Sequence, residues 1–414
     1  MASMFERRLT NCRRRLERSA TDLLVCFPSP NLTYLTGFEE SPSERHLLLF
    51  VPRIGTPALV APKMYEQQLA TLPIDEPPLE VRTWDDDEDP LELIRTVLET
   101  FETREGLEFG ETSTETITEI DGDDRANNDN RTPGDASILV DDRMWATLSQ
   151  DLRACAPDAT FGLASDVLES QRIQKDDVEL EALRRAGAIA DRVSLEIRSR
   201  GEELIGTTES DLASEIEALL EAKGAGKPAF STIVAAGANG AQPHHHSSDH
   251  EIERGEPIVL DFGAFVDAEL EGGTGRYPGD QTRTIVPGEP TEEYKRVHEI
   301  VQKAQQAAVE AVEPGVTASA VDETARSVIE HAGYGDAFTH RTGHGVGLEV
   351  HEPPYIVGGN DRELEPGMVH SIEPGIYLDG KFGVRIEDLV VVTETGAERL
   401  NDSPRGWETG DVSR

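Results

Sequence analysis

The chain has 414 residues, which is enough for two domains with separate cores. It carries 80 acidic against 39 basic residues, a formal net charge of −41, which argues against binding nucleic acid or an anionic membrane. Because molar salt shortens the Debye length to about 3 Å, this excess of acid predicts a salt-loving source organism. An acidic protein from an ordinary environment is the alternative.

Neither the apolar runs nor the N-terminus indicates a membrane span or a signal peptide. Runs such as 47–51 have the length of a strand and are far too short to cross a bilayer. Polar residues follow the N-terminal pair of arginines where a signal would need an apolar stretch, so we expect an amphipathic helix. The cysteines are widely spaced without a metal-ligand pattern, which predicts reduced thiols in a cytoplasmic protein; they are Cys12, Cys26 and Cys155.

Residues 1–165 alternate short apolar runs with amphipathic stretches, which is the pattern of an α/β domain. The runs "HLLLFVPR" and "ASILVDD" are typical of strands, and "PLELIRTVLETF" is typical of a helix between them. The segment 112–136 is acidic and rich in glycine and asparagine, so we expect a surface insertion that carries no chemistry.

Residues 166–400 form the second predicted domain, followed by a C-terminal tail over 401–414. A capping box at 176–179 predicts the start of a long helix with an apolar stripe. Further along, Thr208–Gly226 and Thr317–Gly335 are similar in sequence, and each is expected to be a helix ended by glycine. We interpret this repeat as two α/β half-units related by duplication, which would enclose a site between them.

Acidic side chains stand inside apolar strand patterns of the C-terminal half, where acids are rare. They are Asp261, Asp280, Glu373 and Glu387, of which Asp280 is expected just before its strand. Each of them alone is compatible with an acid that is paired in the core. Four carboxylates in one cavity, however, would repel one another and take up protons unless cations neutralised them. Two divalent ions would supply the matching charge.

The stretch "HRTGHGVGLEVHE", residues 340–352, combines three histidines with three glycines. The glycines disfavour a helix, so His340 and His344 are not expected to form a pair on one helical face. They allow the backbone to pass close to a crowded centre and to present His344 as a nitrogen ligand, while His351 faces the substrate. Structural histidines with satisfied hydrogen bonds are the alternative for this segment.

Five motifs, in chain order, carry a resemblance to a known family: "VLDFG", "YPGDQTRTIV", "HRTGHGVGLEVHEPP", "MVHSIEPGIY" and "GVRIEDLVVVT". Together they resemble the pita-bread metallopeptidases, a family that contains methionine aminopeptidase, aminopeptidase P, prolidase and creatinase. The resemblance covers residues 165–400. It implies an α/β chain in which a creatinase-like N-terminal domain precedes a pita-bread catalytic domain with pseudo-twofold duplicated halves.

The resemblance also implies a site with two divalent metal ions. Asp261 would bind one ion with both oxygens, Asp280 and Glu387 would bridge the two ions, and His344 and Glu373 would complete the other. An oxygen-rich site with one imidazole suits Mn²⁺, with Co²⁺ or Zn²⁺ as possible replacements.

The spacing of the two aspartates departs from the family, because Asp280 follows Asp261 at a longer distance than is usual. The additional residues are acidic and rich in glycine, which suits a longer hairpin tip. Asp280 is retained as the ligand because "YPGDQTRT" around it matches the motif. Asp267 and Glu269, within the additional residues, are the competing candidates.

The mechanism implied by the resemblance is peptide hydrolysis by a water that the two ions acidify. Glu373 would carry a proton from this water toward the leaving nitrogen. His351 would stabilise the oxyanion or position the carbonyl, and His244 would assist in placing the substrate. Arg385 lies two residues before Glu387, and it would hold the acids or a substrate carboxylate, or form a purely structural ion pair with an aspartate.

The N-terminal domain and the linker "RIQKDDVELEALRRA" resemble those of prolidase, aminopeptidase P and creatinase. The resemblance therefore implies hydrolysis of Xaa-Pro bonds in a dipeptide or a longer peptide, by a homodimer. One alternative is a creatinase-like hydrolase of a small non-peptide C–N substrate, and another is a catalytically inactive pita-bread module that binds proteins. Retention of all five expected ligands argues against both alternatives.

Overall fold

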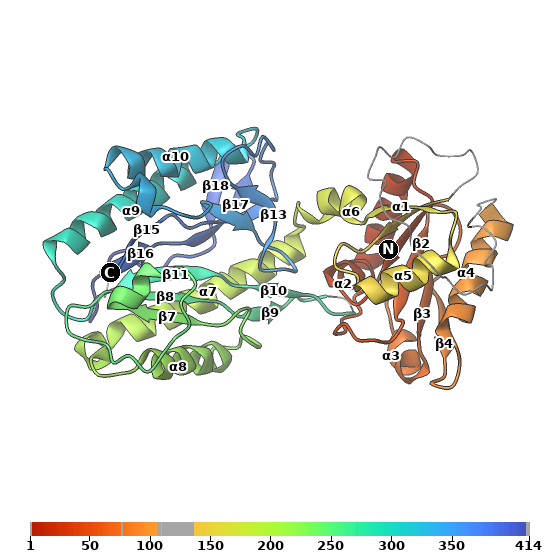
Figure 1. The fold of residues 1–414 in the computed structure, drawn as a ribbon, viewed down its shortest axis with the longest axis horizontal. Helices are drawn as coiled ribbons and strands as arrows, with labels where there is room; N and C mark the ends of the chain where they lie inside the picture. Colours follow the sequence, from red (N-terminus) through yellow and green to blue (C-terminus); the bar gives the residue numbers. More distant parts are fainter. Residues whose placement is uncertain (1, 76–77, 106–108, 110–135, 271, 411–414) are drawn as a thin grey trace, which may run out of the picture. The chain divides into compact units, whose positions relative to one another are not determined.

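The computed structural model of the chain describes residues 2–75, 78–105, 109, 136–270 and 272–410 (Figure 1). The described residues form two compact units, Met1–Arg172 with Leu270–Gly275, and Ile173–Glu269 with Arg276–Arg414. The mixed α/β class is confirmed in both units. The boundary expected near residue 165 precedes the last helix of the first unit, and the expected insertion 112–136 lies outside the described residues except for Ala136.

The first unit contains one mixed sheet with the strand order β4-β3-β2-β1-β5-β6. Strand β1 pairs antiparallel with β2 and parallel with β5, and its four residues are all buried. The strands are β1 (Leu23–Cys26), β2 (Leu48–Pro52), β3 (Ala58–Pro62), β4 (Glu80–Trp84), β5 (Ser137–Val140) and β6 (Thr160–Leu163). The helices are α1 (Met4–Arg18), α2 (Pro30–Thr36), η1 (Lys63–Tyr65), α3 (Glu66–Leu69), α4 (Pro90–Glu105), α5 (Ala146–Cys155) and α6 (Ser165–Arg172).

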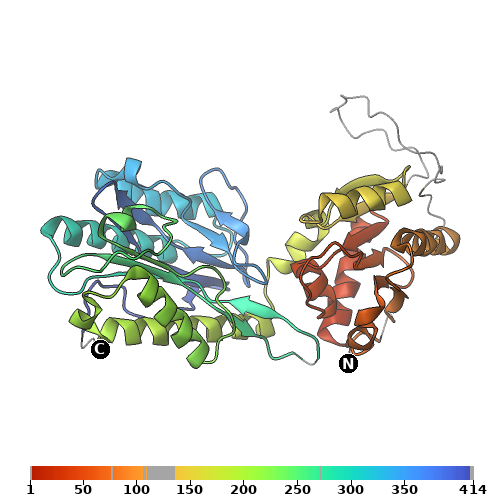
Figure 2. The same ribbon diagram turned by 60° about the horizontal axis from the view of Figure 1, so that its bottom comes forward.

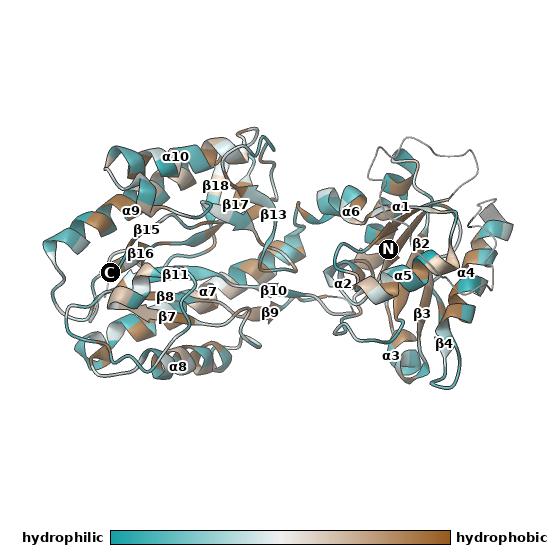
Figure 3. Cartoon of the chain, in the orientation of Figure 1, coloured by the Kyte–Doolittle hydropathy of each residue, from teal (hydrophilic) through white to brown (hydrophobic). Residues whose placement is uncertain are grey.

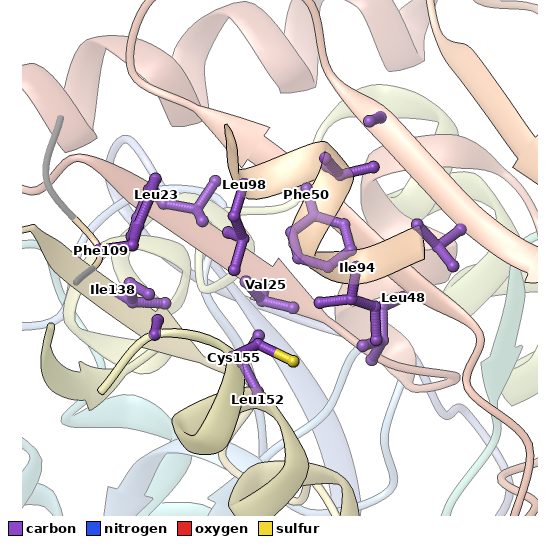
Figure 4. Close-up of a cluster of buried hydrophobic side chains, with 14 of the residues drawn as sticks. Leu23, Val25, Leu48, Phe50, Ile94, Leu98, Phe109, Ile138, Leu152 and Cys155 are labelled. Atoms are coloured by element: carbon purple, nitrogen blue, oxygen red, sulfur yellow. The ribbon is translucent and has the colours of Figure 1, made fainter. Parts of the chain in front are cut away.

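The core of the first unit lies between this sheet and helices α4 and α5. Leu23, Val25 and Phe50 from the strands pack with Ile94 of α4 and Leu152 of α5 (Figure 4). The burial of such side chains removes apolar surface from water and is the main contribution to the stability of this unit. All the cysteines of the chain are buried free thiols, and burial raises the pKa of the Cys12 thiol to about 12, which leaves it unreactive; they are Cys12, Cys26 and Cys155.

The second unit places its strands between two pairs of helices, α7 and α8 on one side and α9 and α10 on the other (Figures 1 and 2). The helices are α7 (Asp177–Ser199), η2 (Gly201–Leu204), α8 (Glu209–Ala222), η3 (Gly237–Ala241), α9 (Glu292–Glu310), α10 (Ala318–His331) and η4 (Gly335–Ala337). The strands are β7 (Ile233–Ala236), β8 (Ile258–Phe262), β9 (Phe265–Asp267), β10 (Arg276–Pro278), β11 (Gln281–Ile285), β12 (Gly343–Gly345), β13 (Glu352–Ile356), β14 (Val369–Ile372), β15 (Gly375–Leu378), β16 (Phe382–Arg385), β17 (Asp388–Thr393) and β18 (Gly396–Arg399).

Four sheets organise these strands, with the orders β11-β8-β7, β13-β12-β14-β17-β18, β15-β16 and β9-β10. Helices α8 and α10 carry hydrophilic and hydrophobic residues side by side, and β11, with the sequence QTRTI, is largely hydrophilic (Figure 3). The predicted capping box of α7 is present, since Asp176 accepts from the Glu179 N–H and Glu179 accepts from the Asp176 N–H. Among the described helices, none combines the length and the apolar character that a membrane crossing requires.

The structure matches the predicted duplication of the second unit. Helices α8 and α10 both begin after a capping threonine, Thr208 and Thr317, whose hydroxyl accepts from a backbone N–H three residues ahead. Thr208 forms an isolated bridge with Glu251, and Thr317 forms the equivalent bridge with Glu363. The repeated sequence therefore folds into the same local contacts twice.

Residues 401–410, which the sequence predicted as part of a tail, belong to the second unit. The buried guanidinium of Arg198 donates to the carbonyl groups of Pro404, Gly406 and Glu408 at 2.7 to 2.8 Å. Three carbonyl acceptors compensate much of the cost of burying this guanidinium. This segment is thus held by α7, through contacts that composition alone does not indicate.

Candidate metal centre

The predicted acidic residues come together where strands end and the chain changes sheet. Asp261 lies in β8, and Asp280 immediately precedes β11, which pairs with β8 so that Thr282 stands opposite Asp261. Glu373 follows β14 where the chain leaves the five-stranded sheet for β15, and Glu387 stands where the chain returns from β16 to β17. Asp280 therefore lies just before a strand, as the sequence predicted, whereas the prediction that Glu373 and Glu387 lie within strands is wrong. Each of the three occupies the irregular residue beside a strand end, where a side chain is free to turn inward.

Asp280, His344 and Glu387 form the closest group among the described residues. One ligand atom from each lies within 4.8 Å of the others, and all three side chains are buried. The Nε2 atom of His344 is 3.7 Å from Asp280 Oδ2 and 3.3 Å from Glu373 Oε1. These distances leave room for a cation between donors that are not bonded to one another.

Asp261 completes the group from the β8 side. Its Oδ2 accepts from Arg385 Nη2 at 2.7 Å, whereas its Oδ1 is buried and has no hydrogen-bond partner among the described residues. A buried carboxylate oxygen without a donor costs free energy, unless a cation is bound there. The orphaned oxygen thus fits a metal ligand.

His344 offers a lone pair to this group. Its Nδ1–H donates to the carbonyl of Gly345 at 3.2 Å, which leaves Nε2 as the unprotonated nitrogen that faces the carboxylates. Burial, with a smaller contribution from His351, lowers the pKa of His344 to about 3, so the imidazole is neutral. A neutral imidazole whose other nitrogen is hydrogen-bonded is the usual form of a metal-binding histidine.

The glycines around His344 are required by close backbone packing. A Cβ atom on Gly343 would lie 2.0 Å from the carbonyl oxygen of Ser371, and one on Gly345 would lie 2.2 Å from that of Pro353. These residues form β12, between β13 and β14, and not a helix or a loop. The glycines therefore allow β12 to lie close to the backbone of its neighbours on both sides.

Burial and mutual repulsion raise the pKa values of three carboxylates of the centre, those of Asp280, Glu373 and Glu387. Burial is the main cause that raises the pKa of Asp280 and of Glu387 well above the ordinary value, and the charges of neighbouring acids add to it. Burial likewise raises the pKa of Glu373 to about 7, against the opposing effect of Arg385. Divalent cations would remove this repulsion, and oxygen donors with one imidazole are a suitable ligand set for them.

Hydroxyl groups and one guanidinium orient the carboxylates. The Thr282 hydroxyl donates to Glu387 Oε2 at 2.7 Å and accepts from Arg385 Nε at 3.1 Å. The Ser371 hydroxyl donates to Glu373 Oε1 at 3.1 Å. Sequence reasoning missed Thr282 and Ser371, although a signal was present: each stands two residues from a candidate ligand, on the same side of an extended segment.

Arg385 is fully occupied by protein groups. Besides Asp261 and Thr282, its Nη1 donates to the Tyr377 hydroxyl at 2.9 Å and to the Pro243 carbonyl at 3.3 Å. Of the roles expected for Arg385, its contacts match the ion pair with an aspartate.

The other histidines that the sequence analysis considered, His351, His244 and His340, differ in exposure. The His351 ring lies edge-on to the His344 ring, with 4.1 Å between the centroids, and is exposed at residue level. His244 is exposed and follows Pro243, the residue held by Arg385. His340 is half-buried: its Nδ1–H donates to the Arg341 carbonyl, its Nε2 accepts from the Tyr377 hydroxyl, and desolvation lowers its pKa to about 4. His340 is therefore a structural histidine, and it forms no helical pair with His344.

The two competing acids of the hairpin lie outside the centre. Strands β9 and β10 pair antiparallel, which confirms the longer hairpin between Asp261 and Asp280. Asp267 pairs with Arg276 at 3.2 Å and Glu269 with Arg185 at 3.2 Å, and both carboxylates are largely exposed. Neither joins the buried group.

A buried set of carboxylates around one neutral imidazole, in a two-unit α/β chain, defines a metal-dependent enzyme, and comparisons with known proteins agree. Residues 181–394 match the model of metallopeptidase family M24, and residues 8–142 match that of the creatinase/prolidase N-terminal domain. The chain is 39% identical to the "probable dipeptidase PepE" of Mycobacterium tuberculosis, over 97% of this chain and 96% of the relative.

Two further relatives carry a more specific name. The Xaa-Pro dipeptidase of Pyrococcus furiosus is 45% identical over 59% of this chain and 68% of its own length. The crystal structure of a prolidase from Thermococcus sibiricus superposes with a TM-score of 0.82 and 35% identity, covering 98% of this chain and 99% of that chain. The chain belongs to metallopeptidase family M24, a family of enzymes that use divalent metal ions.

Proposed function

We propose that the chain hydrolyses the peptide bond before proline in a dipeptide or short peptide, with two divalent metal ions bound by the buried centre. The observation that carries the proposal is the convergence of Asp280, His344 and Glu387 within 4.8 Å. Asp261, Asp280, His344, Glu373 and Glu387 would hold the ions. The names of the relatives from Pyrococcus and Thermococcus support the preference for proline.

Such ions, when bound, would supply an acidified water and a positive charge that polarises the scissile carbonyl. Glu373 lies against both His344 and Ser371, so its carboxylate is placed to take a proton at the centre and to deliver it to the leaving nitrogen. His351, exposed beside His344, is placed to donate a hydrogen bond to the substrate carbonyl. His244 assists in placing the substrate. Arg385 holds Asp261, since its hydrogen bonds go to the protein.

We further propose Mn²⁺ as the natural metal, because oxygen donors outnumber the single imidazole. A homodimer and a cytoplasmic location complete the proposal, the latter supported by the buried free thiols of the three cysteines. The net charge of −41 supports adaptation to salt. Unfolding measured in about 0.1 M and about 3 M KCl tests this adaptation, and equal stability in both would contradict it.

The decisive experiment is an assay of a dipeptide and a tripeptide, each with proline second, in Mn²⁺ and high KCl. We expect turnover of at least one, no turnover of matched peptides with alanine second, and loss of activity after metal removal that Mn²⁺ restores. Metal analysis of the desalted protein should find two ions per chain. Turnover of neither proline peptide by a metal-loaded protein would refute the assignment.

A further inference from the structure

The segment 236–248, which carries His244, has almost no regular structure. It begins at the last residue of β7, contains the short helical turn η3, and continues through the histidine triplet before the chain reaches β8. His244 itself is exposed, so its own packing cannot hold it in place. Whatever fixes this histidine beside the centre must act on the backbone that flanks it.

Glu209, the first residue of α8, is a fully buried acid that the sequence did not single out. Its Oε1 accepts from the Ala236 N–H at 2.7 Å and from Asn239 Nδ2 at 3.0 Å. Its Oε2 accepts from His245 Nε2 at 2.8 Å, from the Ser248 N–H at 2.9 Å and from the Ser248 hydroxyl at 2.7 Å. One carboxylate thus collects five donors from both ends of the segment.

These donors keep Glu209 ionised inside the protein. Burial acts to raise its pKa, but the hydrogen bonds, with the Ala236 N–H foremost, hold the pKa below the ordinary value. The helix start adds backbone contacts, since the N–H of Ser210 donates to the Ser248 carbonyl at 3.0 Å. A buried anion with matched donors is a rigid attachment point, because displacing any donor exposes an uncompensated charge.

The opposite side of the segment is attached to the candidate metal centre. Arg385, which holds Asp261, donates to the carbonyl of Pro243. Gly240 lies so close to β16 that a Cβ atom on Gly383 would be 1.9 Å from its carbonyl oxygen. His244 therefore stands between Pro243, bound to Arg385, and His245, bound to Glu209.

The equivalent position of the second half shows that α8 does not need this acid for its own start. Thr208 caps α8 and Thr317 caps α10, and the residue after the cap is Glu209 in one case and Ala318 in the other. Both are fully buried. Helix α10 starts with a buried alanine at this position, so α8 does not need the carboxylate of Glu209 in order to form. The hydrogen-bond partners of this carboxylate lie outside the helix.

We propose that Glu209 is a positioning residue, which clamps segment 236–248 and thereby sets His244 beside the metal centre. The inference rests on the proposed function, in which His244 places the substrate. Glu209 does not contact the reacting atoms and acts only through the segment. A glutamine cannot replace it, since its amide nitrogen would face donors that need an acceptor.

The test compares Glu209→Gln, His244→Ala and the double variant in the full-length Mn²⁺-loaded protein. We expect Glu209→Gln to lower kcat/KM for the proline dipeptide by about 10- to 100-fold, with the metal content unchanged. In the His244→Ala background the same change should lower kcat/KM by less than about threefold, because the effects of two residues that act through one path are not additive. Equal losses in both backgrounds would overturn the proposal, since they would indicate a purely structural role.

The matched control is Glu256→Gln. Glu256 also accepts from a histidine, His250 Nε2 at 3.0 Å, and from the Glu253 N–H at 2.9 Å. It packs against Gly237, but its donors lie beyond segment 236–248, so the change removes no hydrogen bond from that segment. We expect it to leave kcat/KM within about twofold of wild type, as is usual when no functional segment is released. A loss equal to that of Glu209→Gln would show that the effect is not specific to the clamp.

Amide hydrogen exchange tests whether Glu209 holds segment 236–248, independently of the proposed activity. In Glu209→Gln we expect faster exchange over residues 236–248 than in the wild type, and unchanged exchange over β14 and β17. Unchanged exchange over 236–248 would refute the clamp, whereas a metal-loaded wild type that cleaves neither peptide would refute the proposed function instead. Should Glu209→Gln not fold, Ser248→Ala removes one donor and must show the same effects on a smaller scale.

Discussion

Helices α8 and α10 occupy equivalent places in the two halves of the second unit, and their surroundings have diverged. Both begin after a capping threonine and both make the same isolated bridge to a later segment. The first half contributes Asp261 and Asp280 to the centre, and the second contributes His344, Glu373 and Glu387. The scaffold was kept in duplicate while the functional side chains were not, because backbone contacts tolerate many side chains and a metal centre does not.

The proposed proton carrier, Glu373, is the sharpest difference between the halves, since it belongs to the second half. Glu373→Ala should lower kcat by about 10²- to 10⁴-fold, the range for loss of a general acid–base group. The protein should stay folded, as judged by circular dichroism, because a buried acid of raised pKa is removed. The exposed Glu269→Gln in the first-half hairpin serves as a control and should retain full activity. Retained turnover in Glu373→Ala would show that another group carries the proton.

Thr282 links the halves, because it stands on β11 of the first half and orients Glu387 of the second. Thr282→Val keeps the side-chain shape and removes the hydroxyl, so we expect a loss of about 10- to 100-fold in kcat/KM or in Mn²⁺ affinity. Thr282→Ser, which retains the hydroxyl, should recover most of it. Metal titration and steady-state kinetics measure both quantities, and identical behaviour of the valine and serine variants would contradict the role.

The long helices of the two halves differ in their titratable groups. Helix α9 carries the buried His298, whereas α7 contains no histidine. Burial lowers the pKa of His298 to about 4, so the unfolded chain binds a proton below about pH 6.5 that the folded chain refuses. This stability is complete above the unfolded pKa and falls as the pH falls toward 4.

His298→Gln should therefore flatten the acid side of the stability curve. Between pH 7 and pH 5 the wild type should lose about 2 kcal/mol more than the variant, measured by denaturant unfolding at both pH values. Changes at the metal centre affect both proteins and cancel in this difference. Parallel pH curves for the two proteins would contradict the expectation.

Substitutions of the two capping threonines test the difference between the halves directly, and their expected effects are the smallest. Thr208→Ala and Thr317→Ala should each lower the unfolding free energy by about 1 kcal/mol, since each removes one cap. Activity should fall only for Thr208→Ala, because that cap precedes Glu209 and its clamped segment. Equal effects of the two variants on activity would show that the halves have not diverged as described.

Much of the candidate site could be predicted because its signals are local. Acids beside apolar strands, glycines at a tight crossing and five ordered motifs are all visible along the chain. The exact positions of the acids could not be predicted, since Glu373 and Glu387 lie beside strand ends where the chain changes sheet. Thr282 and Ser371 were missed although each stands two residues from a candidate ligand, and Glu209 was missed because its partners lie far along the chain and a helical acid carries no pattern of its own.

The sequence by itself determined the caps, the hairpin between Asp261 and Asp280, the repeated helices and the types of side chain that can bind metal, because each depends on neighbours within a few residues. Only the tertiary structure decided that Asp280, His344 and Glu387 meet within 4.8 Å, that residues 401–410 pack on α7, and that Glu209 holds the segment of His244. Those contacts join residues that are distant along the chain, so strand register and helix packing create them.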